Sequence, residues 1–168
     1  ALSAMGFTLN QLKDDDAALE YLNKALVIDP KNLQVISIIA MIHESRKDFT
    51  VSDSLYSEAI KIDSSNVLIL NNYAYSLAER GINLKEALTM AKKAIASEPK
   101  NSSYLDTIGW IYYRLGDYKK ARTHIEEAAK LEDKNPTLID HLGDVQFKLG
   151  NKNKALDLWK KAFEIDST

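Results

Sequence analysis

The sequence lacks several features that would point to common classes of protein. None of its 168 residues is cysteine, which excludes disulfide bonds, thiolate catalysis and zinc sites built on cysteine. The net charge is −2, so no general attraction to nucleic acid or to an anionic membrane surface is expected. No apolar run is long enough to cross a bilayer, and no signal peptide is recognisable. We therefore expect no direct insertion into a membrane.

Motifs for catalysis or cofactor binding are also missing. The sequence has no glycine-rich phosphate loop, no HExxH or GxSxG string, and no recognisable pair of nucleophile and base. The three histidines, His43, His124 and His141, do not share the spacing of metal ligands. The run from Asp14 to Asp16 is better interpreted as a helix N-terminus than as a metal site, because carboxylates are favoured there. We predict no enzyme activity, no cofactor, and neither catalytic nor metal-binding residues.

The segment from Asn101 to Lys134 shows what the sequence does contain. Its first half carries Leu105, Ile108, Gly109 and Tyr112, spaced by one, three or four residues, as on one face of a helix. A turn is predicted at Gly116–Asp117. The second half has Ala121, Ile125 and Ala128 on one face, so the segment predicts a helix, a tight turn and a second helix.

This unit repeats along the whole chain. Asn32, Asn66, Asn101 and Asn135 lie 34, 35 and 34 residues apart, and each is placed where a helix N-cap belongs. Small residues recur in the same register. In the first helix of each unit they are Gly6, Ala40, Ala74, Gly109 and Gly143; in the second they are Ala18 and Ala25, Ser52 and Ala59, Ala87 and Ala94, Ala121 and Ala128, and Ala155 and Ala162. Short antiparallel helices can cross closely only where such residues meet.

With this period and these small residues, strings such as IGWIYYRLGDYKKA and LGDVQFKLGNKNKA resemble tetratricopeptide repeats. The resemblance implies an all-α fold, a right-handed α-solenoid of five stacked helix-turn-helix repeats with about ten helices. We expect one array over 1–168, with repeats at about 1–32, 33–66, 67–101, 102–135 and 136–168. The β-branched run from Val35 to Ile42 could pass for a strand, but the register predicts a helix.

The repeat pattern is imperfect at some positions. Ser52 replaces the usual alanine, Lys47 replaces the usual turn glycine, and Lys152 stands where an aromatic residue is typical. Neither end shows the polar cap that repeat arrays need. We therefore expect a fragment of a longer protein, or ends covered by another chain. The last helix carries an apolar patch that predicts self-association of the chain, formed by Leu156, Trp159 and Phe163.

In this family the first helices line a concave groove, and the register assigns inward positions to this chain. The predicted partner-binding residues are Met41, Asn71, Tyr75, Asp106, Trp110, Tyr113, Arg114, Asp140, Asp144 and Phe147. The small residues and their aliphatic neighbours account for helix pairing without these aromatics, which are typical of binding hot spots. The alternative is that Trp110 and Tyr113 pack between neighbouring repeats and bind nothing.

We predict a protein-interaction scaffold that binds an extended peptide or partner segment in this groove. The acidic groove disfavours RNA and the carboxylate-binding mode of chaperone-associated family members. Self-association, and an accessory role beside a catalytic domain, are the alternatives. The third to fifth units look most like bacterial repeat arrays, many of them exported to the cell envelope. The compartment stays open between cytoplasm and periplasm or envelope.

Overall fold

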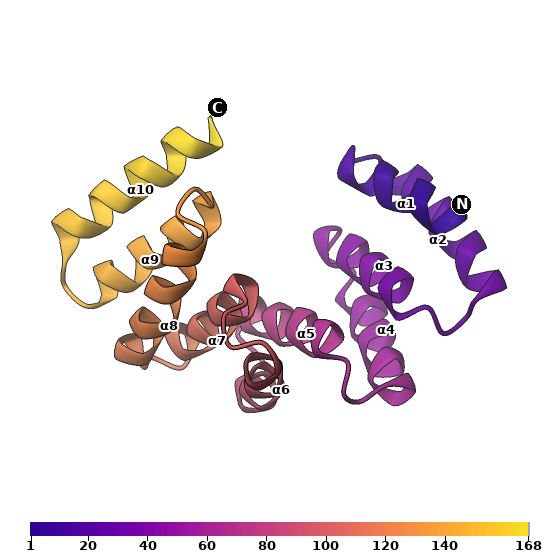
Figure 1. Ribbon diagram of the computed structural model, residues 1–168, viewed down its shortest axis with the longest axis horizontal. Coiled ribbons are helices and arrows are strands. Elements are labelled where there is room, and N and C mark those ends of the chain that lie inside the picture. Colours follow the sequence, from indigo (N-terminus) through magenta and orange to yellow (C-terminus); the bar gives the residue numbers. More distant parts are fainter. Residues whose placement is uncertain (168) are drawn as a thin grey trace. The chain divides into compact units, whose positions relative to one another are not determined.

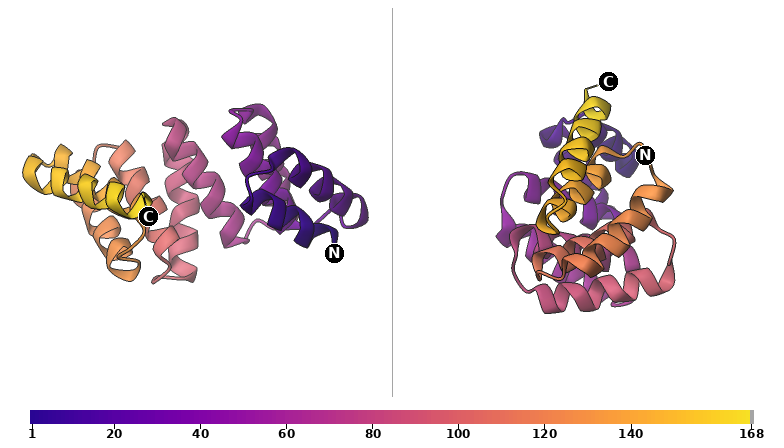
Figure 2. Two further views of the ribbon diagram at one scale, coloured as in Figure 1. Left: turned by 90° about the horizontal axis from the view of Figure 1, so that it is seen from above. Right: turned by 90° about the vertical axis from the view of Figure 1, so that its left-hand side faces the viewer.

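The computed structural model describes residues 1–167, and within them every regular element is an α-helix (Figures 1 and 2). There are ten helices in this range. Their bounds are Leu2–Gln11 (α1), Asp15–Ile28 (α2), Leu33–Ser45 (α3), Phe49–Ile62 (α4), Val67–Arg80 (α5), Leu84–Ser97 (α6), Ser102–Arg114 (α7), Tyr118–Leu131 (α8), Pro136–Lys148 (α9) and Lys152–Asp166 (α10). No helix in the described part of the chain has the length and hydropathy needed to cross a bilayer. The predicted all-α class is confirmed, including a helix over the β-branched run from Val35 to Ile42.

The chain divides into two compact units, Ala1–Tyr73 and Ala74–Thr168. In the first unit α1 packs on α2, α3 packs on α4, and α2 contacts α3. In the second unit α7 packs on α8 and α9 on α10, while α6 contacts α7 and α8 contacts α9. Each unit therefore contains two pairs of successive helices, α1–α2 and α3–α4 in the first and α7–α8 and α9–α10 in the second, and the pairs are stacked within each unit. The single array over 1–168 stays a prediction.

The predicted asparagine caps begin the first helix of four repeats. The side chain of Asn32 accepts a hydrogen bond from the backbone N–H of Val35, and Asn66 accepts one from Ile69. Asn101 accepts from Tyr104. Asn135 accepts from both Thr137 and Leu138, directly before the proline that starts α9. Each cap satisfies backbone donors that have no partner inside the helix, and so fixes where the repeat begins.

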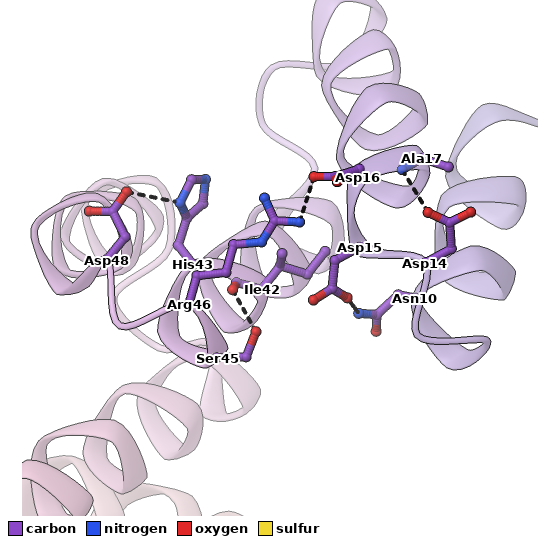
Figure 3. Close-up of polar contacts among 10 residues, drawn as sticks. All are labelled: Asn10, Asp14, Asp15, Asp16, Ala17, Ile42, His43, Ser45, Arg46 and Asp48. Carbon is purple, nitrogen blue, oxygen red and sulfur yellow. Dashed lines mark hydrogen bonds and ion pairs between the residues drawn. The ribbon is translucent and has the colours of Figure 1, made fainter.

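The acidic run also acts as a helix start, as predicted. Asp14 accepts from the N–H of Ala17, and Asp15 and Asp16 stand in the first turn of α2 (Figure 3). Asp16 also pairs with Arg46, whose guanidinium lies 2.8 Å from its Oδ1 and comes from the end of α3. This pair is largely exposed, so it contributes little to stability, but it connects the turns of the first two repeats.

All the small residues of the repeat register are buried. At Gly109 an added Cβ would lie 2.5 Å from Cγ1 of Ile125, and at Gly6 it would lie 2.6 Å from Leu22. At Gly143 it would lie 2.5 Å from Nε1 of Trp159. The three glycines therefore permit a large side chain of the partner helix to press directly on the backbone. Ser52 keeps its polar group satisfied by donating its hydroxyl to the carbonyl of Phe49, which explains why it is tolerated at a buried position.

The turn inside each hairpin requires a residue with positive φ. Gly116 and Gly150 supply it at φ 82° and 87°, whereas Lys13 and Lys47 occupy the same place in the first unit at φ 64° and 62°. A residue with a Cβ is disfavoured in this left-handed region by roughly 1–2 kcal/mol. Lys47 departs from the repeat pattern, so the backbone at this residue is strained, but the turn keeps its usual shape.

The fit between Gly109 and Ile125 can be tested by a double-mutant cycle. Gly109→Ala should destabilise the second unit by about 1–3 kcal/mol through overcrowding, and Ile125→Ala by about 2–5 kcal/mol through a cavity. The third repeat has alanine at both equivalent positions, Ala74 and Ala91, and both are buried. The double variant should therefore lose at least 1 kcal/mol less than the sum of the single variants. Additive losses in urea unfolding would contradict direct contact at this crossing.

Replacing Lys47 by glycine should stabilise the first unit. The substitution removes the left-handed strain, and this gain is partly offset by the greater flexibility of glycine in the unfolded chain, leaving about 0.5–1 kcal/mol. Gly150→Ala is the reciprocal control, since nothing lies within 4 Å of its added Cβ and only backbone strain should appear. A lower urea midpoint for Lys47→Gly would show that the lysine side chain stabilises the turn instead.

Candidate functional site

A buried polar and aromatic cluster joins the fourth and fifth repeats in the second unit. His141 lies in the middle of α9, and its ring stacks on Trp110 of α7 with centroids 4.1 Å apart and planes at 13°. Nδ1 of His141 lies 2.9 and 3.0 Å from the two carboxylate oxygens of Asp106, also in α7. Because a carboxylate accepts hydrogen bonds, Nδ1 carries a proton and donates it. The pair fastens α9 to α7 across the boundary between repeats.

Charge around His141 favours its protonated form. Burial by itself lowers the pKa of this imidazole, but the hydrogen bond and charge of Asp106 outweigh it, with the charges of Glu79 and Asp140 added. The pKa of His141 is therefore raised above its ordinary value. Both side chains of the pair are less than a tenth exposed, so the interaction is weakly screened by solvent.

Trp110 is enclosed by rings on both faces. Opposite His141, the ring of Tyr113 stacks on it at 4.6 Å and 7°. Trp110 is only 7% exposed, and its Nε1 is buried without a hydrogen-bond partner among the residues described. The expectation that Trp110 offers contact area to a partner is therefore corrected. Its large ring fills the space between α7 and α9. The small residues of the repeat register and their aliphatic neighbours do not fill this space.

A second group of side chains stays accessible beside this cluster. Nε1 of Trp159 in α10 donates a 3.2 Å hydrogen bond to Oδ1 of Asp144 in α9. The ring of Phe147, which is 46% exposed, lies 5.7 Å from that of Trp159. Asp140 is exposed one helical turn before Asp144. We call Tyr113, Asp140, Asp144, Phe147 and Trp159 the acid–aromatic surface.

Electrostatics within the acid–aromatic surface suit a cation. Burial first, and then the charge of Asp140, raise the pKa of Asp144, while the Trp159 hydrogen bond, His141 and Lys148 oppose the rise. Burial and the charge of Asp144 also raise the pKa of Tyr113, so its ring stays a neutral phenol. Neither Asp140 nor Asp144 forms an ion pair with any residue in the described range. A lysine or arginine from outside would meet two carboxylates and several aromatic faces.

The structure distributes the ten predicted residues over both units. Met41 and Asn71 belong to the first unit, and the other eight belong to the second. Met41 is 48% exposed, but Asn71 is buried, as are Asp106 and Trp110 in the second unit. Arg114 is exposed and its guanidinium lies close to Gly81 in the turn after α5. Tyr75 is half-buried, with its ring 6.5 Å from that of His141.

Burial changes the expected role of three of these residues. Asp106 and Trp110 contribute to packing between α7 and α9, and Asn71 has a side-chain oxygen that is buried without a hydrogen-bond partner. Asn71 is therefore not placed to bond a peptide backbone at the surface, and Asp106 is not placed to receive a basic side chain. Tyr113, Asp140, Asp144 and Phe147 retain the accessibility that the prediction requires.

Two residues were missed as parts of this region. His141 was set aside because it shares no metal-ligand spacing with another histidine, although its partner is the carboxylate of Asp106, 35 residues away. That separation is one residue more than the repeat period of 34. A histidine and a carboxylate about one period apart are therefore the sequence signal that could have predicted this contact between neighbouring repeats. Trp159 was assigned only to self-association, yet it also supports Asp144. Among residues 1–167 no group of three or more acidic or histidine side chains could hold a metal ion.

The His141–Asp106 pair predicts a specific pH dependence. Because the pKa of His141 is raised on folding, its stabilisation is complete below about pH 6.5, the unfolded value, and is lost as the pH rises through the folded value. Urea unfolding should show stability falling above pH 6.5, by at most about 1.4 kcal/mol per pH unit for one proton. The variant His141→Gln should lose this component of the slope.

His124 provides the control of opposite sign. Burial lowers the pKa of His124, so its contribution is gained as the pH rises towards the unfolded value of about 6.5. His124→Gln should therefore leave the fall in stability above pH 6.5 intact. An unchanged slope in His141→Gln would show that the histidine is not charged in the folded protein.

Comparison with known proteins agrees with this architecture. Residues 1–32 match the family described as tetratricopeptide repeat, and residues 80–162 match the family described as anaphase-promoting complex, cyclosome, subunit 3. A curated relative, the TPR repeat-containing protein PA4667 of Pseudomonas aeruginosa, is 28% identical over 108 residues. That alignment covers 64% of this chain but only 18% of the relative.

Solved structures show the same fold at low sequence identity. PilF of Pseudomonas aeruginosa has a TM-score of 0.78 at 22% identity, covering 97% of this chain and 74% of that one. PilW, described as a type IV pilus biogenesis factor, has a TM-score of 0.85 at 19% identity, covering 97% and 76%. TTC0263, a TPR protein of Thermus thermophilus, has a TM-score of 0.82 at 21% identity, covering 97% and 89%.

The family match at the N-terminus, the curated relative and the solved structures agree with the register of small residues. Ten helices over residues 1–167 correspond to about five helix pairs. Repeats of this type are scaffolds that typically mediate protein–protein interactions. The chain is a tetratricopeptide-repeat protein, similar to bacterial members such as PilF, PilW and TTC0263.

Proposed function

We propose that the second unit is a non-catalytic protein-binding module that captures a partner segment on the acid–aromatic surface. The observation that supports it is the state of Asp144: a half-buried carboxylate that holds one tryptophan N–H and lies beside a second, exposed carboxylate at Asp140. Burial of a carboxylate without an ion pair costs free energy, and the more distant charges of His141 and Lys148 do not prevent the pKa of Asp144 from being raised. A basic side chain from a partner would recover that cost.

The aromatic residues define what should accompany the basic side chain. Tyr113 is half-buried, with one face stacked on Trp110 and the ring of Tyr118 5.6 Å away, and Phe147 exposes nearly half of its surface. Rings of this kind supply most of the binding energy at interfaces, because they bury large areas with little loss of conformational freedom. We propose an extended segment with a lysine or arginine next to an apolar or aromatic residue. The basic group lies between Asp140 and Asp144, and the apolar group lies against Phe147 and Tyr113.

This surface is narrower than the groove predicted from the repeat register. The proposal excludes Asp106, Trp110 and Asn71 as direct contacts, because they are buried. It keeps Tyr113, Asp140, Asp144 and Phe147 and adds Trp159, which orients Asp144. Nucleic acid is disfavoured, since two unpaired carboxylates at the centre of the surface repel phosphate groups.

A random peptide display library provides a test that needs no known partner. Selection against the folded protein should enrich peptides with lysine or arginine adjacent to an apolar or aromatic residue. The variant Asp140→Asn/Asp144→Asn should no longer enrich the basic residue, because the charge that attracts it is gone. Asp133→Asn is the control for each single substitution: it removes one negative charge from an exposed loop position.

Affinity measurements on a selected peptide make the test quantitative. Asp144→Asn and Phe147→Ala should each weaken binding by about tenfold or more, which corresponds to about 1.4 kcal/mol. Asp133→Asn should leave the affinity unchanged. Helicity measured by circular dichroism should be the same for all variants. Enrichment of peptides without basic residues, or equal affinity of the Asp144 variant, would refute the proposed surface.

A further inference from the structure

In its protonated form, His141 is a buried cation beside the acid–aromatic surface. Its ring stacks on Trp110 of α7, and Nδ1 donates to both carboxylate oxygens of Asp106 at 2.9 and 3.0 Å. The indole face that covers the ring favours a positive charge. His141 precedes Asp144 by three residues in α9, which places both side chains on the same side of that helix. A charge at His141 therefore acts on a carboxylate that we propose for capture.

The charges that act on His141 are carboxylates from α5, α7 and α9. They are Glu79 of α5, Asp106 of α7, and Asp140 and Asp144 of α9. Tyr75 of α5 adds a phenol, with its ring 6.5 Å from the imidazole. No lysine or arginine in the described range forms an ion pair with any of the four carboxylates, although Lys148 acts on Asp144 from a distance. Within residues 1–167, the cation paired with this group is therefore His141.

The two ring nitrogens of His141 have different surroundings. Nδ1 is held by Asp106, whereas Nε2 forms no hydrogen bond among the residues described. Because the Asp106 carboxylate accepts from Nδ1, that nitrogen keeps its proton, and the proton that leaves comes from Nε2. Loss of the Nε2 proton removes the positive charge but keeps the hydrogen bond between α9 and α7. The charge of His141 can therefore change while α9 stays in place.

We propose that His141 is the resident counter-ion of these carboxylates, and that a captured lysine or arginine takes over this role, so that capture releases the Nε2 proton to solvent. This inference rests on the proposed capture of a basic segment at Asp140 and Asp144. Two positive charges beside the same carboxylates repel each other, so the captured cation disfavours the charged imidazole. The coupling is reciprocal: neutral His141 binds the cation more tightly. Affinity for a basic segment should therefore increase as the pH rises through the titration of His141.

Asp144 contributes a pH dependence of the same sign. Burial raises the pKa of its carboxyl group, so protonation of Asp144 weakens capture in the acidic range. The variant His141→Gln separates the two contributions, because it removes the imidazole and leaves Asp144 in place. The glutamine amide also retains an N–H group for Asp106.

Histidine titrations by NMR on the wild-type chain test the coupling. The sequence has three histidines, so their ring signals can be assigned by single substitutions. A lysine-containing peptide from the display selection should lower the titration midpoint of His141 by about 0.5 pH units or more. The same peptide with norleucine in place of lysine should produce less than half of this change. His43 of the first unit, which lies 3.3 Å from Asp48, is the internal control and should keep its midpoint.

A variant supplies the cation without any peptide. Asp140→Lys places an ammonium group beside His141, whereas Asp140→Asn only removes a carboxylate. Because the lysine adds repulsion to the lost attraction, the midpoint of His141 should fall further in Asp140→Lys than in Asp140→Asn. Equal midpoints in the two variants would show that a cation at this surface does not act on His141, and would overturn the inference.

Calorimetry measures the released proton itself. Titrations of the lysine peptide in buffers of different ionisation enthalpy, at the His141 midpoint of the free protein, should show release of about 0.2–0.5 proton. His141→Gln should release none at this pH. Its affinity should match that of the wild type at high pH, where His141 is neutral.

The outcomes distinguish this inference from the proposed capture. Binding that requires Asp144 but releases no proton would overturn the inference and leave the capture intact. Release that persists in His141→Gln would also overturn it, because the proton would come from another group. A selection that enriches no basic peptide would refute the capture, and the inference with it.

Discussion

Where the two helices of a repeat cross at a glycine, a large side chain of one helix rests directly on the backbone of the other. At Gly109 and Gly143 the space that a Cβ would take is already filled by Ile125 and Trp159 of the partner helix. This contact sets the angle and distance of each hairpin, and so decides which faces remain for the neighbouring repeat. Gly6 meets Leu22 in the same way in the first repeat, and the second and third repeats carry the buried alanines Ala40 and Ala74 at this position.

That close pairing has a consequence for function in the second unit. With α7 and α8 drawn together, α9 can lie on both, and the space between α7 and α9 is filled by the stacked rings of Trp110 and His141. Packing therefore takes up the centre of the face that repeat register alone would assign to a partner. What remains accessible is its border, with the half-buried Tyr113 and with Asp144 and Phe147, which both contact Trp159 of the last helix. The surface that we propose is therefore smaller than the predicted groove.

Much of the fold could be predicted because its determinants are local or periodic. Four asparagine caps lie where the period places them. The run from Asp14 to Asp16 forms the predicted helix N-terminus, with Asp14 as the cap and Asp15 as the first residue of α2. Lys47 was recognised as unusual for a turn, and it adopts the positive φ that glycine normally supplies.

The site was less predictable. The repeat register assigns a residue to the inner side of the array, but it does not distinguish a residue that faces solvent from one that the next repeat covers. Trp110 and Tyr113 are three residues apart on one helix, yet the first is enclosed and the second half exposed. The difference comes from His141, whose position depends on how far α9 is displaced along α7. That displacement is set by packing of whole helices, and no short sequence pattern records it.

The central claim, that a large side chain rests directly on the backbone of its partner helix, can be measured by nuclear Overhauser effects in solution. The sequence has only two tryptophans, so the indole N–H signals can be assigned readily. The account predicts strong effects between the Hα protons of Gly143 and the indole Hδ1 and Hε1 of Trp159, and between Hα of Gly109 and the side chain of Ile125. Absence of both contacts in the folded protein would contradict it.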